Sequence, residues 1–193
     1  MSAKRSLSRL LSGLFLSGAA IATTVVALPT APGIAQTNQG LTLFGGVDSE
    51  YRLPYTLRNN EPRSPRAAYF LRVPATRMDR AASSLRITYP DAFTRRRGAF
   101  NTDQIEVRRG RGTGGREIPV REVTWNEESG QIDIYLDEVI PADTSFVVAM
   151  RGIRNPNRFG MHRFNLQAET TGDVLPRYLG TWELLVAEEM GNR

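Results

Sequence analysis

The sequence predicts an all-β protein, an antiparallel β-sandwich of the immunoglobulin-like (Ig-like) type with about 7–9 strands and an extended N-terminal arm. Apolar and polar residues alternate with period two in about eight short segments, and turn residues separate these segments. No window of about 11 or more residues keeps the 3.6-residue period of a helix. The chain has 193 residues, of which 40% are hydrophobic, so it is long enough to bury one core.

Residues 1–35 are predicted to be a secretory signal peptide. Residues 1–9 contain cations and no acid, an uncharged apolar run of 19 residues follows at 10–28, and Ala35 ends a small-residue cleavage site. The alternative is an uncleaved anchor, because about 20 apolar residues suffice to span a bilayer. We expect cleavage after Ala35 and no stable membrane span in the remaining chain. The chain is therefore predicted to be exported to the periplasm or cell envelope, with the extracellular medium and the thylakoid lumen as alternatives.

Residues 36–66 are weakly patterned and are predicted to form the extended arm. One apolar run at 41–44 leaves room for a single strand at the start of this arm. Pro54, Pro62 and Pro65 interrupt the rest, and proline has no backbone N–H for a sheet ladder.

Residues 67–190 are predicted to form the β-sandwich domain. In each alternating segment one set of side chains faces the core and the other faces water. The segment at 118–125 changes phase, which predicts a bulge or bend near Arg121 and Glu122. The segment at 146–150 is continuously apolar, as in a strand that is covered on both faces. In chain order the predicted strands are 69–73, 85–89, 105–108, 118–125, 132–136, 146–150, 162–168 and 182–186.

Two connections within this domain have distinctive sequences. Residues 75–84 are the best helical candidate and are predicted to form a short turn or helix between two strands. Residues 108–116, RRGRGTGGR, lie between two predicted strands and are predicted to form a long hairpin loop.

The composition removes much of the common catalytic repertoire. The chain has no cysteine and a single histidine, His162, so disulfides, thiolate metal sites and multi-histidine metal sites are excluded. His162 shares its strand phase with Phe164 and is expected to be a buried, hydrogen-bonded structural residue. The acids at 133–143 do not have the spacing of a calcium-binding loop. We therefore predict no enzymatic activity, no catalytic residue, no metal and no cofactor.

The cations are concentrated in the first half of the domain. Residues 52–121 carry a net charge of +10 and residues 122–193 carry −6, and every cation after residue 9 is arginine. Arginine binds carboxylates, phosphates and sulfates through its planar fork of donors. Nucleic acid is not expected as a partner, because aromatic residues do not alternate with the arginines. The densest cations are candidate anion-binding residues, with a solvated loop as the alternative: Arg95, Arg96, Arg97, Arg108, Arg109, Arg111 and Arg116.

A second candidate site lies in the segment that begins at Arg154. Pro156 biases Asn155 toward an extended backbone, and Asn155 can cap a turn through its own side chain. Gly160 allows backbone angles that other residues avoid. These residues predict either a fold-determining turn between two core strands or a ligand-binding loop.

Several short motifs follow one another in a characteristic order over about residues 67–187. They are a strand ending in Val73-Pro74, IPV at 118–120, VIPAD at 139–143, IRNP at 153–156 followed by Gly160, and YLG at 178–180. In this order and spacing they resemble a cyanobacterial family of small exported proteins, the domain of unknown function DUF2808. The resemblance implies export and a β-sandwich, and it supplies no catalytic residue. The chain departs from the family at Ala142, where glycine is frequent, and in its arginine-rich loop.

The predicted export, fold and family together favour a non-catalytic binding or structural module of the cell envelope. Its expected partner is an envelope protein or an anionic envelope polymer. The alternative is an anion- or polysaccharide-binding module that uses the arginine-rich loop at 108–116.

Overall fold

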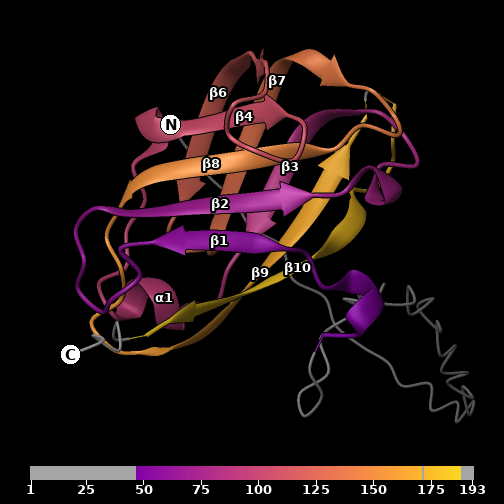
Figure 1. Ribbon diagram of the computed structural model, residues 1–193. Coiled ribbons are helices and arrows are strands. Elements are labelled where there is room, and N and C mark those ends of the chain that lie inside the picture. Colours follow the sequence, from indigo (N-terminus) through magenta and orange to yellow (C-terminus); the bar gives the residue numbers. More distant parts are fainter. Residues whose placement is uncertain (1–46, 171, 188–193) are drawn as a thin grey trace, which may run out of the picture. The chain divides into compact units, whose positions relative to one another are not determined.

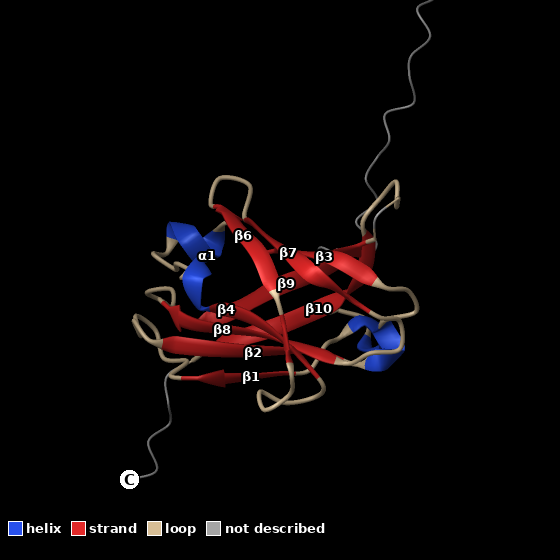
Figure 2. Ribbon diagram, turned by 90° about the horizontal axis from the view of Figure 1, so that it is seen from above, coloured by secondary structure: helices blue, strands red, loops and turns tan. Residues whose placement is uncertain are grey.

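The computed structural model describes residues 47–170 and 172–187, and these form two antiparallel sheets of five strands each (Figures 1 and 2). The strand order is β1-β2-β8-β4-β5 in the first sheet and β10-β9-β3-β7-β6 in the second. The predicted all-β antiparallel sandwich is therefore confirmed. The strands are β1 (Tyr55–Arg58), β2 (Ala67–Val73), β3 (Ala82–Thr88), β4 (Ile105–Arg109), β5 (Glu117–Ile118), β6 (Val120–Asn126), β7 (Gln131–Ile140), β8 (Phe146–Ile153), β9 (Gly160–Glu169) and β10 (Arg177–Val186).

Helical structure in this part of the chain is limited to single turns. They are η1 (Ser49–Tyr51), η2 (Ala75–Arg77), α1 (Ala92–Arg95) and η3 (Thr102–Gln104). The helical candidate at 75–84 thus contains only η2, and its last residues already belong to β3. The sequence did not indicate α1, because one turn is shorter than any window in which a helical period can be recognised. Within the described residues, no helix has the length and apolar character needed to cross a membrane.

Each of the eight predicted strand segments is found in the sheets, and the strand total among the described residues is ten rather than the expected 7–9. One additional strand arises because the segment at 118–125 is divided by Pro119. Before it, β5 pairs with β4 in the first sheet, and after it, β6 pairs with β7 in the second. The pairing register shifts between Val120 and Glu122, at the position where the phase change predicted a bulge.

The other additional strand is β1, which lies within the segment predicted as an extended arm. It pairs with β2 at the edge of the first sheet, and its side chains are half-buried on both faces except at Arg58. Such a strand has no clear alternation of apolar and polar residues, which explains why the sequence pattern did not indicate it. The predicted signal peptide and the short strand at 41–44 lie outside the described residues.

The core lies between the two sheets. Its largest fully buried side chains come from both layers and include Tyr69, Phe146, Phe164 and Trp182. The continuous apolar run of β8 is buried on both faces, as predicted. On the outer face, Val147 and Ala149 pack under Phe70, and the guanidinium groups of Arg58 and Arg151 cover the Phe70 ring at 5.2 and 5.9 Å from its centroid.

Candidate functional site

Three loops meet at the end of the sandwich where α1 lies (Figure 1). They are the β1–β2 loop (59–66), the β3–β4 connection that contains α1 (89–101), and the β8–β9 loop (154–159). The three loops are joined to one another by backbone hydrogen bonds, which fixes their relative positions. These bonds are Arg63 N to Pro156 O (2.9 Å), Asn155 N to Ser64 O (2.8 Å), Asn157 N to Arg96 O (2.8 Å), Ala99 N to Arg154 O (3.0 Å) and Arg154 N to Ala99 O (2.9 Å).

Asn155 is the side chain that ties these loops to the core. It is 1% exposed, and its Oδ1 accepts a hydrogen bond of 2.6 Å from the Tyr69 hydroxyl of β2. Its Nδ2 donates to the carbonyls of Asn59 (3.2 Å) and Glu61 (2.9 Å) in the β1–β2 loop. Burial raises the pKa of Tyr69 far above its usual range, so the hydroxyl stays protonated as a donor. Asn155 therefore holds the loop conformation and is not free to contact a ligand.

The three joined loops carry seven arginines, which we call the loop arginines. They are Arg63, Arg66, Arg95, Arg96, Arg97, Arg154 and Arg158. Arg96 is half-buried and the other six are exposed. Among the residues that the structure describes, no carboxylate forms an ion pair with any of them. The structure thus brings Arg95, Arg96 and Arg97 together with the predicted loop at 154–160.

Acids at the same end are fewer than arginines. Glu61 and Asp91 are the acids within the three loops. Glu127 and Glu128 belong to the β6–β7 turn, which is joined to Tyr89 by a hydrogen bond from Tyr89 N to the Gly130 carbonyl (2.9 Å). Burial raises the pKa of Tyr89, and the negative charges of Glu127 and Asp91 add to this effect.

The arginine-rich hairpin at 108–116 lies at the opposite end of the sandwich. Its loop is joined to the β7–β8 turn by a hydrogen bond from Gly110 N to Ser145 O (2.7 Å). Three of its four arginines pair with acids. Arg111 forms no ion pair with a described residue and has an exposed side chain. The pairs are Arg108 with Glu106 (2.9 Å) and Glu117 (3.3 Å), Arg109 with Glu138 (3.7 Å), and Arg116 with Glu138.

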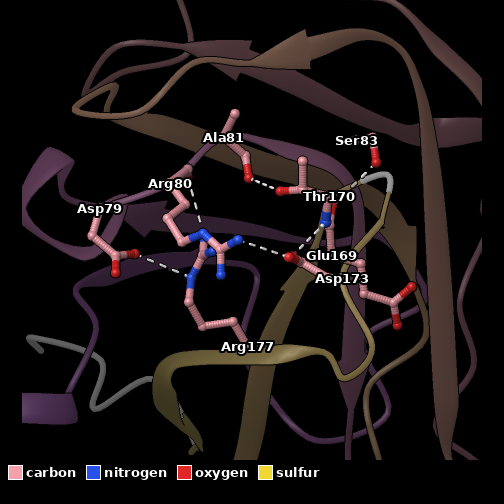
Figure 3. Close-up of polar contacts among 8 residues, drawn as sticks. All are labelled: Asp79, Arg80, Ala81, Ser83, Glu169, Thr170, Asp173 and Arg177. Atoms are coloured by element: carbon pink, nitrogen blue, oxygen red, sulfur yellow. Dashed lines mark hydrogen bonds and ion pairs between the residues drawn. The ribbon is translucent and has the colours of Figure 1, made fainter.

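A second set of paired arginines at this opposite end is shown in Figure 3. Arg80 pairs with Asp173 (3.0 Å) and Arg177 pairs with Asp79 (3.1 Å). Arg177 also donates to the Arg80 carbonyl (3.1 Å). These contacts, together with a hydrogen bond from Thr170 to the carbonyl of Ala81, hold the β9–β10 connection against the β2–β3 connection. Arg80 and Arg177 therefore act within the fold, in contrast to the loop arginines.

His162 lies near Arg96, one of the loop arginines. It is 2% exposed, as its strand phase predicted, and its ring meets Phe93 of α1 edge-on at 5.4 Å between centroids. The predicted hydrogen bond is wrong, because neither ring nitrogen has a partner among the described residues. Burial lowers the pKa of His162, and the positive charge of Arg96 lowers it further. Both effects favour the neutral form of His162 beside the half-buried Arg96.

Sequence reasoning missed three of the loop arginines, namely Arg63, Arg66 and Arg158. They are isolated in the sequence, and only the folding of three distant loops places them near Arg95–Arg97. Arg63 and Arg66 each follow a proline, and Arg158 follows an asparagine, so a search for arginines in turns would have included all three. The described residues contain no group of three or more histidine, cysteine, aspartate or glutamate side chains that could hold a metal ion.

Comparison with known proteins identifies the family. The chain matches the family described as "Protein of unknown function (DUF2808)" over residues 41–186. The chain belongs to the DUF2808 family. No curated protein matches this DUF2808 chain.

Solved structures with a similar arrangement of strands share little sequence with this DUF2808 protein. The collagen-binding domain of a Staphylococcus aureus adhesin has 10% identity and a TM-score of 0.40, covering 70% of this chain and 97% of its own. The collagen-binding domain of the surface protein RspB of Erysipelothrix rhusiopathiae has 12% identity and a TM-score of 0.39, covering 72% of this chain and 48% of its own. An uncharacterized Nocardia farcinica protein with an Ig-like fold has 14% identity and a TM-score of 0.35, covering 71% and 99%. In the RspB comparison the chain thus spans about half the length of its neighbour.

Proposed function

We propose that the protein is exported to the cell envelope, with its N-terminal segment serving as the signal peptide, and acts there as a non-catalytic binding module. Its ligand is an anionic component of the envelope, and its binding site is formed by the loop arginines. The motifs shared with an exported cyanobacterial family support the proposed compartment and a cyanobacterial source. The observation that carries the proposal is a contrast among the described residues. The seven loop arginines form no ion pair with a carboxylate, whereas five arginines at the other end do: Arg80, Arg108, Arg109, Arg116 and Arg177.

The physical basis of this proposal is the cost of gathering like charges. Guanidinium groups on loops that are joined by hydrogen bonds repel one another, and these have no acidic partner among the described residues. Such an arrangement creates a positive potential that attracts anions and increases their association rate. Exposed guanidinium groups also keep their donors free for bidentate contacts with carboxylate, phosphate or sulfate.

The arginine-rich hairpin at 108–116 is the less favoured position for the ligand. Arg108 already donates hydrogen bonds to Glu106, Glu117 and the Gly115 carbonyl, so an anion would have to displace these acceptors. We therefore assign the anion site to the loop arginines at the opposite end of the sandwich and not to this hairpin.

Retention on immobilised heparin at increasing salt tests the proposal. The variant Arg66→Ser, Arg95→Ser, Arg158→Ser removes three exposed loop arginines. The matched control Arg80→Ser, Arg111→Ser, Arg116→Ser makes the same change in net charge at the other end. We expect the first variant to elute at clearly lower salt than the wild type and the control to elute close to it. Equal elution of the two variants, or a larger loss in the control, would show that the loop arginines are not the site.

A further inference from the structure

Three exposed apolar side chains adjoin the loop arginines, and we call them the apolar strip: Phe159, Met161 and Leu185. They are 73%, 56% and 46% exposed, respectively. Met161 and Leu185 are directly opposite each other in the β9–β10 pairing, so their side chains lie on the same outer face of the second sheet. The next pair on this face is the ion pair Arg163–Glu183 (3.2 Å), which ends the strip toward the middle of the sheet.

The apolar strip and the loop arginines are parts of one surface. Arg158 directly precedes Phe159 at the tip of the β8–β9 loop. On the other side, Asn60 Nδ2 donates to the Leu185 carbonyl (3.2 Å), and Ala187 N donates to the Asn60 carbonyl (3.3 Å). These bonds place the β1–β2 loop, with Arg63 and Arg66, beside the end of β10. The apolar strip is therefore bordered by arginines of two loops, and these arginines have no acidic partner in the described part of the chain.

We propose that this surface docks onto a lipid bilayer that contains anionic headgroups, with Phe159 inserted among the lipids and the loop arginines at the headgroups. This inference rests on the proposed function and names the kind of anionic ligand. A soluble anionic polysaccharide would satisfy the arginines and leave Phe159, Met161 and Leu185 in water. An anionic bilayer satisfies both, because phosphate groups lie directly above an apolar phase. Phenylalanine and leucine are common on the apolar side of protein segments that lie at this boundary.

The opposite end of the molecule provides the contrast. Val174 and Leu175 in the β9–β10 connection are also exposed, at 94% and 74%. The neighbouring arginines Arg80 and Arg177 are neutralised by Asp173 and Asp79 (Figure 3). Apolar exposure therefore occurs at both ends. At the α1 end it adjoins seven arginines that have no acidic partner among the described residues, whereas Arg80 and Arg177 near Val174 and Leu175 are paired.

A tryptophan placed at the tip of the β8–β9 loop tests the insertion. The variant Phe159→Trp is mixed with vesicles of phosphatidylglycerol and phosphatidylcholine, some with brominated acyl chains, and with vesicles of phosphatidylcholine alone. Leu175→Trp is the matched control at the opposite end. We expect a blue shift and bromine quenching for Phe159→Trp on the anionic vesicles only, and neither effect for Leu175→Trp. Because both variants carry the same N-terminal segment, its own contribution to vesicle binding cancels in this comparison.

Binding strength gives a second readout. Phe159→Ser is expected to weaken binding to the anionic vesicles about ten-fold or more, because the variant lacks the phenylalanine side chain that the bilayer would bury. Absence of quenching at position 159, with retention on heparin unchanged, would overturn the lipid proposal and leave a soluble polymer as the ligand. Absence of both quenching and heparin retention would overturn the proposed function as well. Equal quenching at positions 159 and 175 would show that no particular end of the molecule docks.

Discussion

The Tyr69 hydroxyl donates a hydrogen bond of 2.6 Å to Oδ1 of Asn155, and this bond joins the core of the sandwich to the loops that carry the arginines. The two residues are 86 positions apart in the chain. The remaining hydrogen bonds of Asn155 go to carbonyls of the β1–β2 loop. One buried amide thus positions two of the three arginine-bearing loops.

Replacing Asn155 by alanine is expected to lower the free energy of unfolding by about 2–3 kcal/mol, because one buried hydroxyl and two carbonyls lose their partner. Tyr69→Phe removes only the hydroxyl and is expected to cost less, about 1 kcal/mol. Urea denaturation of both variants measures the difference. If Asn155→Ala were as stable as the wild type, Asn155 would not be the residue that holds the loops.

Gly98 provides a test of how α1 is held against the core. A Cβ at this position would lie 2.5 Å from the Phe93 ring and 2.7 Å from the Phe93 carbonyl. Phe93 is fully buried and stacks on Phe100 at 5.0 Å, so it has little room to move. Gly98→Ala is therefore expected to destabilise the protein by about 1–3 kcal/mol in thermal or urea unfolding. Gly112→Ala, where a Cβ has no atom within 4 Å, serves as the control and is expected to leave stability nearly unchanged.

The buried histidine predicts a dependence of stability on pH. Burial lowers the pKa of His162 in the folded state, so the unfolded chain binds a proton more readily. The contribution of His162 to the free energy of unfolding should therefore be constant at pH values above the pKa of histidine in the unfolded chain. It should decrease as the pH drops below about 6.5. Urea denaturation of the wild type and His162→Leu between pH 5 and 8 separates this effect from the carboxylates. The wild type should lose more stability than the variant on acidification, and an identical loss in both would contradict the prediction.

Arg96 should also influence that histidine directly. Its positive charge contributes to the lowered pKa of His162, so Arg96→Gln is expected to raise this pKa. The chain has a single histidine, and its imidazole protons can be followed without ambiguity in an NMR titration. Arg154→Gln is a suitable control, since Arg96 is the charged residue that acts on His162. A pKa that stays the same or falls in Arg96→Gln would mean that the guanidinium does not lie near the imidazole.

Much of the fold could be predicted from the sequence because most strands bury one face and expose the other. The alternation around Ile87 and around Phe164 reflects this difference, and both side chains are fully buried. The phase change before Val123 likewise reflected a real event, since the chain leaves one sheet at Pro119 and enters the other. Strand β1 could not be recognised, because an edge strand that is half-buried on both faces has no period.

The candidate site was predicted only in part, and for a different physical reason. Arg95–Arg97 stand together in the sequence, whereas Arg63 and Arg158 join them only through hydrogen bonds between distant loops. The arginines of the 108–116 hairpin looked equivalent in sequence. In the structure Arg108 pairs with Glu106 and Glu117, which are close to it in sequence, whereas Arg109 and Arg116 pair with Glu138, which comes from another strand.

The central claim is that the ligand site is formed by the three arginine-bearing loops. Backbone amide NMR of the protein, titrated with a short sulfated oligosaccharide and with phosphatidylglycerol in small bicelles, tests it residue by residue. We predict that the largest chemical-shift changes occur in residues 59–66, 91–101 and 154–161, while the amide resonances of residues 108–116 change little. Shift changes centred on 108–116, or spread evenly over the surface, would contradict it.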